Sequence, residues 1–128
     1  MDSIKVGLVI KEILSSSEEL KAIVGDKIYP LIAPADEYPF VVYRRSGSIP
    51  EDSKDRRIIS SESTIEICSV SDDYGKAVEI ASLVGDALVR RKGVISGINV
   101  ADITYDGDDE DYIEGAFIQR TFFKIKVR

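Results

Sequence analysis

A run of carboxylates near the end of the chain is the densest group of chemically active side chains in the sequence. Hard divalent cations bind several carboxylate oxygens at once, so such a run is a candidate cation site. It lacks the spacing of glycine and glutamate that defines an EF-hand loop, and successive carboxylates on a turn mostly point apart. We interpret the run as an acidic, solvated turn at the tip of a β-hairpin. Its members are Asp106, Asp108, Asp109, Glu110 and Asp111.

Basic side chains form two further groups. Two arginine pairs flank a polar segment at residues 48–55, and lysines alternate along the last predicted strand. Arginine forks suit phosphates or carboxylates, but the acidic residues within the polar segment favour a salt-bridged protein contact. A basic row on an edge strand either prevents sheet-to-sheet aggregation or binds an acidic neighbour, and the sequence leaves both interpretations open. We predict subunit or partner contacts at Arg44, Arg45, Arg56, Arg57, Lys124 and Lys126.

Two residue counts restrict the possible catalytic chemistry. The chain has no histidine and a single cysteine, which excludes Ser-His-Asp and Cys-His catalysis and histidine-ligated zinc. Cys68 lies in an apolar run and is expected to be a buried, inert thiol. We therefore predict no enzymatic activity, no cofactor and no bound metal. One alternative stays open, a metal-dependent phosphoesterase that tight binding of manganese or magnesium would reveal. It would use Asp102, Asp106, Asp108 and Asp109.

Length and charge limit the remaining classes of protein. The 128 residues are 44% hydrophobic and 31% charged, which is the composition of one globular domain spanning residues 1–128. A net charge of −6 disfavours general binding to nucleic acid, because that affinity comes mostly from neutralised phosphates. The first residues lack the uncharged core of a signal peptide, and no apolar stretch reaches the ~20 residues of a membrane span. We expect a protein that is made in the cytoplasm and has no membrane partner.

Apolar spacing predicts the helices that must position these side chains. Repeats of three and four residues predict an amphipathic helix at about residues 3–14, a short helix that stops at Gly25, and a long helix with Ser71 as its N-cap. The basic residues 90–92 followed by Gly93 should end this third helix.

Strands are predicted where apolar residues alternate with polar ones. Residues 28–34 contain two prolines and should be extended but not a central strand. The order α-α-β-β-α-β-β predicts an α+β fold, with a mostly antiparallel sheet of about four strands packed against the long helix and the N-terminal helix. We expect Ile80, Val84 and Leu88 to be buried against Ile65, Ile67, Phe123 and Ile125. The predicted strands are residues 40–43, 58–70, 98–105 and 116–127, with residues 48–57 as a loop or mobile hairpin tip.

One segment of the chain carries a family resemblance. Residues 20–34 read LKAIVGDKIYPLIAP, and residues 38–43 read YPFVVY. With its leading helix, Val-Gly stop, Ile-Tyr-Pro step, Ala-Pro turn and Pro-Phe-Val-Val-Tyr strand, the chain resembles the tail completion or tail terminator family of long-tailed bacteriophages and prophages. The Ile-Glu-Ile strand, the Ser-Asp-Asp-Tyr helix start and the terminal Phe-Lys-Ile-Lys-Val also correspond. The likeness covers nearly the whole chain.

The resemblance implies a structural protein of the virion tail, assembled in the host bacterial cytoplasm. Such proteins form a ring, usually hexameric, on the last disc of the tail tube. The ring ends tube polymerisation and docks the tail to the head connector. The implied partners are further copies of the chain, the tail tube protein and the connector or adaptor protein, whereas DNA only passes through the ring. A head–tail adaptor or neck protein of the same virion is the alternative, and binding to tube protein or to connector distinguishes the two.

A ring through which DNA slides should not hold the DNA. An acidic lumen repels phosphates, whereas each lysine or arginine that neutralises a phosphate adds affinity. The acidic residues 106–111, together with Glu62 and Glu66, are therefore candidates for the lumen. Edge strands and opposed charges would suit head-to-tail contacts between subunits.

Overall fold

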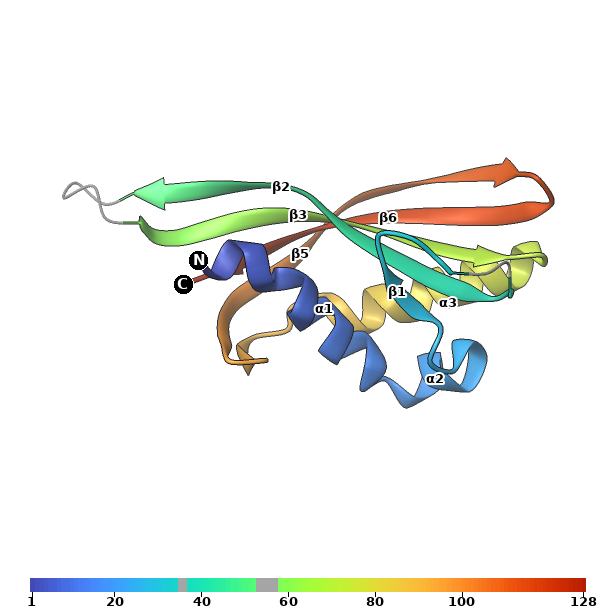
Figure 1. Cartoon of the computed structure of the whole chain (residues 1–128), viewed down its shortest axis with the longest axis horizontal. Coiled ribbons are helices and arrows are strands. Elements are labelled where there is room, and N and C mark those ends of the chain that lie inside the picture. The colour runs from blue at the N-terminus through green and yellow to red at the C-terminus, as the bar shows by residue number, and fades with distance from the viewer. Residues whose placement is uncertain (35–36, 53–57) are drawn as a thin grey trace.

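The structure, a computed structural model, describes residues 1–34, 37–52 and 58–128. In this part of the chain one twisted, six-stranded sheet carries three α-helices on one of its faces (Figure 1). The α+β class is therefore confirmed, whereas the expectation of about four strands was wrong. The two additional strands have three residues each and lie at the two edges of the sheet. A strand of this length is too short to show an alternating pattern in a sequence.

The strands lie across the sheet in the order β1-β2-β3-β6-β5-β4. Neighbouring strands are antiparallel except β1 and β2, which are parallel. β1 belongs to the proline-containing extended segment, and its place at the sheet edge is one where proline is tolerated. The bounds are Ile28–Pro30 for β1, Phe40–Asp52 for β2, Ile58–Ser71 for β3, Gly93–Ile95 for β4, Ile98–Ile113 for β5 and Ala116–Val127 for β6.

Two hairpin arms extend from the sheet toward opposite ends of the molecule (Figure 1). The β2–β3 arm lies at the end where both termini lie, and the β5–β6 arm reaches the other end. Residues 48–52, expected to belong to a loop or a mobile hairpin tip, are the end of β2 and pair with β3. The hydroxyl oxygens of Ser48 and Ser63 lie 2.7 Å apart across this pair, so hydroxyl side chains bond between the strands rather than marking a loop. Residues 53–57 lie outside the described residues.

The acidic run is not a turn. β5 continues through it to Ile113, and the turn is made by Glu114 and Gly115, with φ angles of 50° and 84°. β6 pairs with β5 from Gly107 through the rest of the run, for example where Asp109 lies opposite Arg120. Polar composition does not end a strand whose neighbour is long enough to provide the ladder of hydrogen bonds, so the predicted turn was wrong.

The first helical segment begins with η1, a 3-10 turn at Asp2–Lys5, and continues as α1 at Val6–Ser15. α2 follows at Glu18–Val24. The hydroxyl of Ser17 accepts a hydrogen bond from the N–H of Leu20 and caps α2. The helix expected at residues 3–14 is therefore present, but its first turn is wound more tightly.

The third helix, α3, spans Tyr74–Leu88 and has 15 residues. Its N-cap is Asp73, whereas Ser71, the predicted cap, is the last residue of β3. The helix ends before the basic residues because Arg90, with a φ of 68°, leaves it to bond to the edge of β5. The stop therefore precedes Gly93, and the long helix expected through residues 90–92 was wrong.

The core lies between the helices and the inner face of the sheet. The predicted contact between α3 and the central strands is confirmed, since all seven expected residues are fully buried in one cluster. α1 and α2 add their apolar faces to the same cluster. Within the described residues, no helix is both long and apolar enough to cross a membrane. The confirmed core residues are Ile65, Ile67, Ile80, Val84, Leu88, Phe123 and Ile125.

Candidate functional site

The outer sheet face is the side of the sheet that the helices leave uncovered (Figure 1). It carries ion pairs between side chains on neighbouring strands. Glu51 also accepts a hydrogen bond from the Ser60 hydroxyl at 2.6 Å, and this bond together with Lys126 lowers the pKa of Glu51. Because these groups are exposed to solvent, which screens their charges, each pair contributes little to stability. The pairs are Arg44 with Glu66 at 3.7 Å, Lys124 with Glu62 at 3.7 Å and Lys126 with Glu51 at 3.2 Å.

Arg120 binds two carboxylates of the acidic run on the outer sheet face. Its Nε lies 2.6 Å from Oδ1 of Asp109, and its Nη2 lies 3.5 Å from Oδ2 of Asp111. The hydrogen bond to Asp109 raises the pKa of Arg120. Two of the five carboxylates in the run are therefore paired with a cation of their own chain.

Asp108 and Glu110 lie on the opposite side of the same strand, toward α3, because successive side chains of a strand alternate between faces. The hydroxyl of Tyr74 lies 3.0 Å from both carboxylate oxygens of Glu110 and donates to them. This bond raises the pKa of Tyr74. Asp108 lines a shallow hollow against α3, and Asp106 is exposed at a register shift in β5. In the part of the chain that the structure describes, no group of three or more His, Cys, Asp or Glu side chains is placed to hold a metal ion.

The free end of the β5–β6 arm is aromatic as well as acidic. The rings of Tyr112 and Tyr74 pack on Phe117, with centroid distances of 4.8 Å and 5.6 Å. Tyr112 is 59% exposed and Ile113 is 48% exposed, so this end presents apolar area to solvent. We call it the aromatic arm end, and it consists of Tyr74, Glu110, Tyr112, Ile113 and Phe117.

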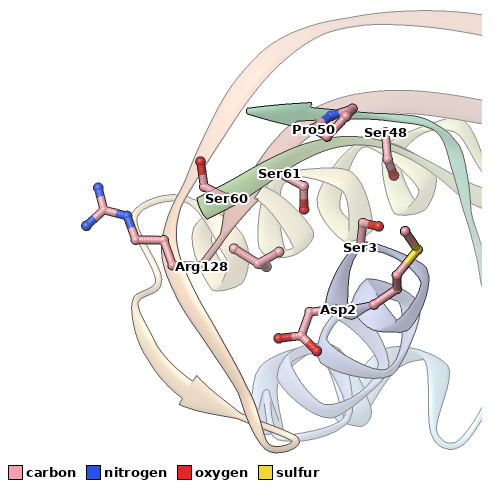
Figure 2. Close-up of a pocket in the computed structure, with 9 residues that line it drawn as sticks. Asp2, Ser3, Ser48, Pro50, Ser60, Ser61 and Arg128 are labelled. Carbon is pink, nitrogen blue, oxygen red and sulfur yellow. The ribbon is translucent and has the colours of Figure 1, made fainter. Parts of the chain in front are cut away.

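A pocket of about 470 Å³ lies at the other end of the molecule. It is enclosed by η1, by the β2–β3 arm and by the end of β6 (Figure 2). Its lining combines hydroxyl groups with apolar atoms, an arginine and the carboxylate of Asp2. We call it the η1 pocket, and its lining includes Ser3, Ser48, Pro50, Ser61, Val127 and Arg128.

Arg45 holds η1 against the β2–β3 arm beside this pocket. Its Nη1 donates to the carbonyl oxygen of Ser3 at 3.2 Å and lies 3.4 Å from the hydroxyl of Ser48. Its guanidinium remains exposed. Arg44, the next residue, lies instead on the outer sheet face with Glu66. Arg56 and Arg57, predicted with them as contact residues, lie outside the described residues.

Asp102 closes part of the exposed edge of β5. One carboxylate oxygen lies 2.5 Å from Nη1 of Arg90, and the other accepts a hydrogen bond from the N–H of Ile103 at 3.0 Å. The N–H of Arg90 donates to the carbonyl oxygen of Ile103 at 2.8 Å. Both backbone groups of Ile103 that point away from β6 are thus bonded. Asp102 therefore acts as an edge cap and lies on the outer sheet face, whereas Asp108 lies on the other face.

Cys68 lies half-buried on the outer sheet face. Burial, with a smaller effect of the Glu66 carboxylate, raises the pKa of its thiol to about 11. At neutral pH the thiol is therefore almost entirely protonated, and a protonated thiol is a poor nucleophile.

The surface features of this α+β fold are the exposed apolar area of the aromatic arm end, the η1 pocket and the ion-paired outer sheet face. The sequence model of the tail completion protein gp17 family matches residues 9–127. The chain therefore belongs to this family of phage tail structural proteins, as the resemblance indicated.

Comparison with solved structures agrees with this placement. A chain in the virion of a native gene transfer agent particle aligns with a TM-score of 0.74 and 19% sequence identity, covering 93% of this chain and 91% of that chain. A second solved protein aligns with a TM-score of 0.61 and 11% identity, covering 99% of this chain and 94% of that chain. At these identities the likeness shows the fold alone. No curated protein matches the chain.

Sequence reasoning missed the aromatic arm end and the η1 pocket. A signal for the first was present, since Tyr112 and Ile113 follow the acidic run and are residues typical of strands. No local sequence pattern indicated the pocket, because its lining residues come from the start, middle and end of the chain.

Proposed function

We propose that copies of this chain form a ring, a hexamer on the virion, that caps the tail tube, ends tube polymerisation and docks the tail to the head connector. The observation that carries the proposal is the family match over residues 9–127. The subunits of a ring contact each other head to tail. Each subunit therefore needs two different surfaces, one of which binds the other surface of its neighbour. The aromatic arm end and the η1 pocket are two such different surfaces at opposite ends of the molecule (Figure 1).

The proposal divides the charged residues by the face on which they lie. On the outer sheet face, Glu62, Glu66, Asp109 and Asp111 are the candidate lumen residues. Asp108 and Glu110 lie off that face and are left for contacts, whereas Asp106 lies at the register shift in β5. The outer sheet face also carries Arg44, Lys124 and Lys126, which are paired with carboxylates of the same chain. Among the predicted contact arginines that the structure describes, we assign Arg45, beside the η1 pocket, to a subunit contact.

Mass measurement by light scattering tests the proposal. The chain is measured alone and then mixed with the tail tube protein of the same particle. The proposal requires a complex of six copies in at least one condition. Electron microscopy of polymerising tube protein then measures tube length with and without the chain. We expect shorter tubes that carry a disc of extra density at one end.

Two outcomes would contradict this function. Tubes that grow to the same length with bound chain along their sides would exclude termination. Capture of the connector protein in place of tube protein would support the alternative, a head–tail adaptor of the same virion. The tail structural role of the family stands in either case.

A further inference from the structure

We propose that the aromatic arm end of one copy seats in the η1 pocket of the next copy. The inference rests on the proposed ring and names the surfaces that would join its subunits. It commits to one occupant of the pocket, a second copy of this chain.

Exposed apolar area is the first observation behind this pairing. The side chains of Tyr112 and Ile113 lie at the end of a hairpin, where they are 59% and 48% exposed. The η1 pocket has a volume of about 470 Å³, within the ~300–1,000 Å³ of sites that bury small ligands. Its apolar lining, from Pro50 and Val127, would cover the area that the hairpin end leaves in water.

Charge is the second observation, and it is independent of the first. Residues 105–119 contain six carboxylates and no lysine or arginine. Arg120 pairs with only two of them, so the arm remains acidic. Arg128 and Asp2 line the η1 pocket, Arg45 lies beside it and Lys5 lies in η1, so the cations there outnumber the carboxylate. Opposite potentials on two surfaces steer their encounter and set their relative orientation.

The position of the two surfaces decides what kind of assembly they can make. They lie at opposite ends of the longest dimension of the molecule (Figure 1), so the arm cannot reach the pocket of its own chain. Each copy therefore offers one arm and one pocket to other copies. When these belong to two different neighbours the contact is heterologous, and it closes into a ring when the rotation per copy divides a full turn. A two-fold dimer of antiparallel copies would also pair each arm with a pocket, and a mass of two copies by light scattering would contradict the ring.

Cysteine cross-linking between two preparations tests the pairing. Both carry Cys68→Ser, which removes the native thiol. One preparation then carries Ile113→Cys in the arm, and the other carries Ser61→Cys in the pocket. We expect a disulfide-linked dimer when the two are mixed under mild oxidation, and none in that time from either preparation alone. The control replaces the arm variant with Ile32→Cys, since Ile32 is 76% exposed and lies outside both surfaces.

A non-covalent measurement accompanies the cross-link. Ile113→Ser should weaken assembly at least tenfold, whereas Ile32→Ser should leave it unchanged and both variants should keep the melting temperature of the parent chain. Each experiment is run with the chain alone and with tube protein. Rings that form without the specific cross-link would overturn this inference and leave the ring proposal standing. Absence of any assembly in both conditions would overturn both.

Discussion

At the scale of single residues, the carboxylates of the acidic run differ in their partners although they are adjacent in the sequence. Asp109 and Asp111 bind Arg120, and Glu110 accepts from the Tyr74 hydroxyl. The alternation of a β-strand causes the difference, because it sends neighbouring side chains to opposite faces. The same alternation separates oxygens that a divalent cation would need on one side.

The hydrogen bond between Tyr74 and Glu110 should shift the titration of the Tyr74 hydroxyl by a measurable amount. The carboxylate raises the pKa of Tyr74 because it stabilises the neutral phenol and repels the phenolate. The stability that this bond adds to the fold is fully present below about pH 10, the pKa of an unfolded tyrosine. It is lost as the pH rises through the pKa of Tyr74 in the folded protein. We expect Glu110→Gln to lower the pKa of this tyrosine toward its ordinary value. Ultraviolet absorbance of tyrosinate measures it, with Tyr74→Phe to assign the signal and Glu114→Gln as the control.

The Cys68 thiol should react slowly in the folded protein. With a pKa of about 11, little thiolate is present at neutral pH, and alkylation requires the thiolate. We expect the alkylation rate at pH 8 to rise at least tenfold when the protein is denatured. In the folded state the rate should climb with pH toward the pKa. Rapid labelling of the folded chain at pH 7 would contradict the assignment.

At the scale of elements, the sequence predicted what local patterns encode. The three α-helices, the strands at residues 58–70 and 116–127 and the buried face of α3 agree with the periodicity of their apolar residues. The edge strand β4 has three residues and exists only because β5 pairs with it. Tertiary pairing likewise extended β2 and β5 through polar segments. The partners are the adjacent strands of hairpins, but the hydrogen-bond ladder of a polar segment comes from its partner strand and not from its own composition, so these parts of the fold could not be predicted.

The contact between α3 and the sheet is tested by a pair of variants on one helix. Val84 is fully buried, whereas Val78, on the same helix, is 41% exposed. An unpaired buried carboxylate costs several kcal/mol, so Val84→Asp should lower the free energy of unfolding by about 3 kcal/mol or more. Val78→Asp should lower it by much less, because a carboxylate at this partly exposed position stays in contact with water. Urea denaturation measures both, and equal effects of the two variants would exclude this packing.

The cap on the edge of β5 gives a second prediction at this scale. Asp102→Ala removes both the acceptor for the Ile103 N–H and the ion pair with Arg90. We expect a loss of about 1 kcal/mol of stability and, because an uncovered strand edge pairs with other chains, more self-association. Asp102→Asn keeps a hydrogen-bond acceptor and should have the smaller effect on stability. Denaturation and light scattering measure the two quantities. Identical behaviour of Asp102→Ala and the parent chain would show that the cap is dispensable.

At the scale of the whole molecule, like charges are spread unevenly. The β5–β6 arm is acidic, the surroundings of the η1 pocket carry arginines, and the outer sheet face pairs its cations with its own carboxylates. A protein with a net charge of −6, whose outer sheet face pairs Arg44, Arg120, Lys124 and Lys126 with carboxylates, offers few sites to phosphates on that face. A basic residue that is already paired with a carboxylate is thus not free to neutralise a phosphate of DNA.

This distribution predicts that duplex DNA does not bind at moderate salt. Affinity for DNA grows with each phosphate that a free lysine or arginine neutralises, and the cations of the outer sheet face are engaged by carboxylates. Fluorescence anisotropy of a labelled duplex should stay flat up to high micromolar protein. Asp109→Asn with Asp111→Asn releases Arg120 and should produce weak, salt-sensitive binding if this face meets DNA. Micromolar binding by the parent chain that Arg44→Glu abolishes would instead indicate a nucleic-acid-binding role.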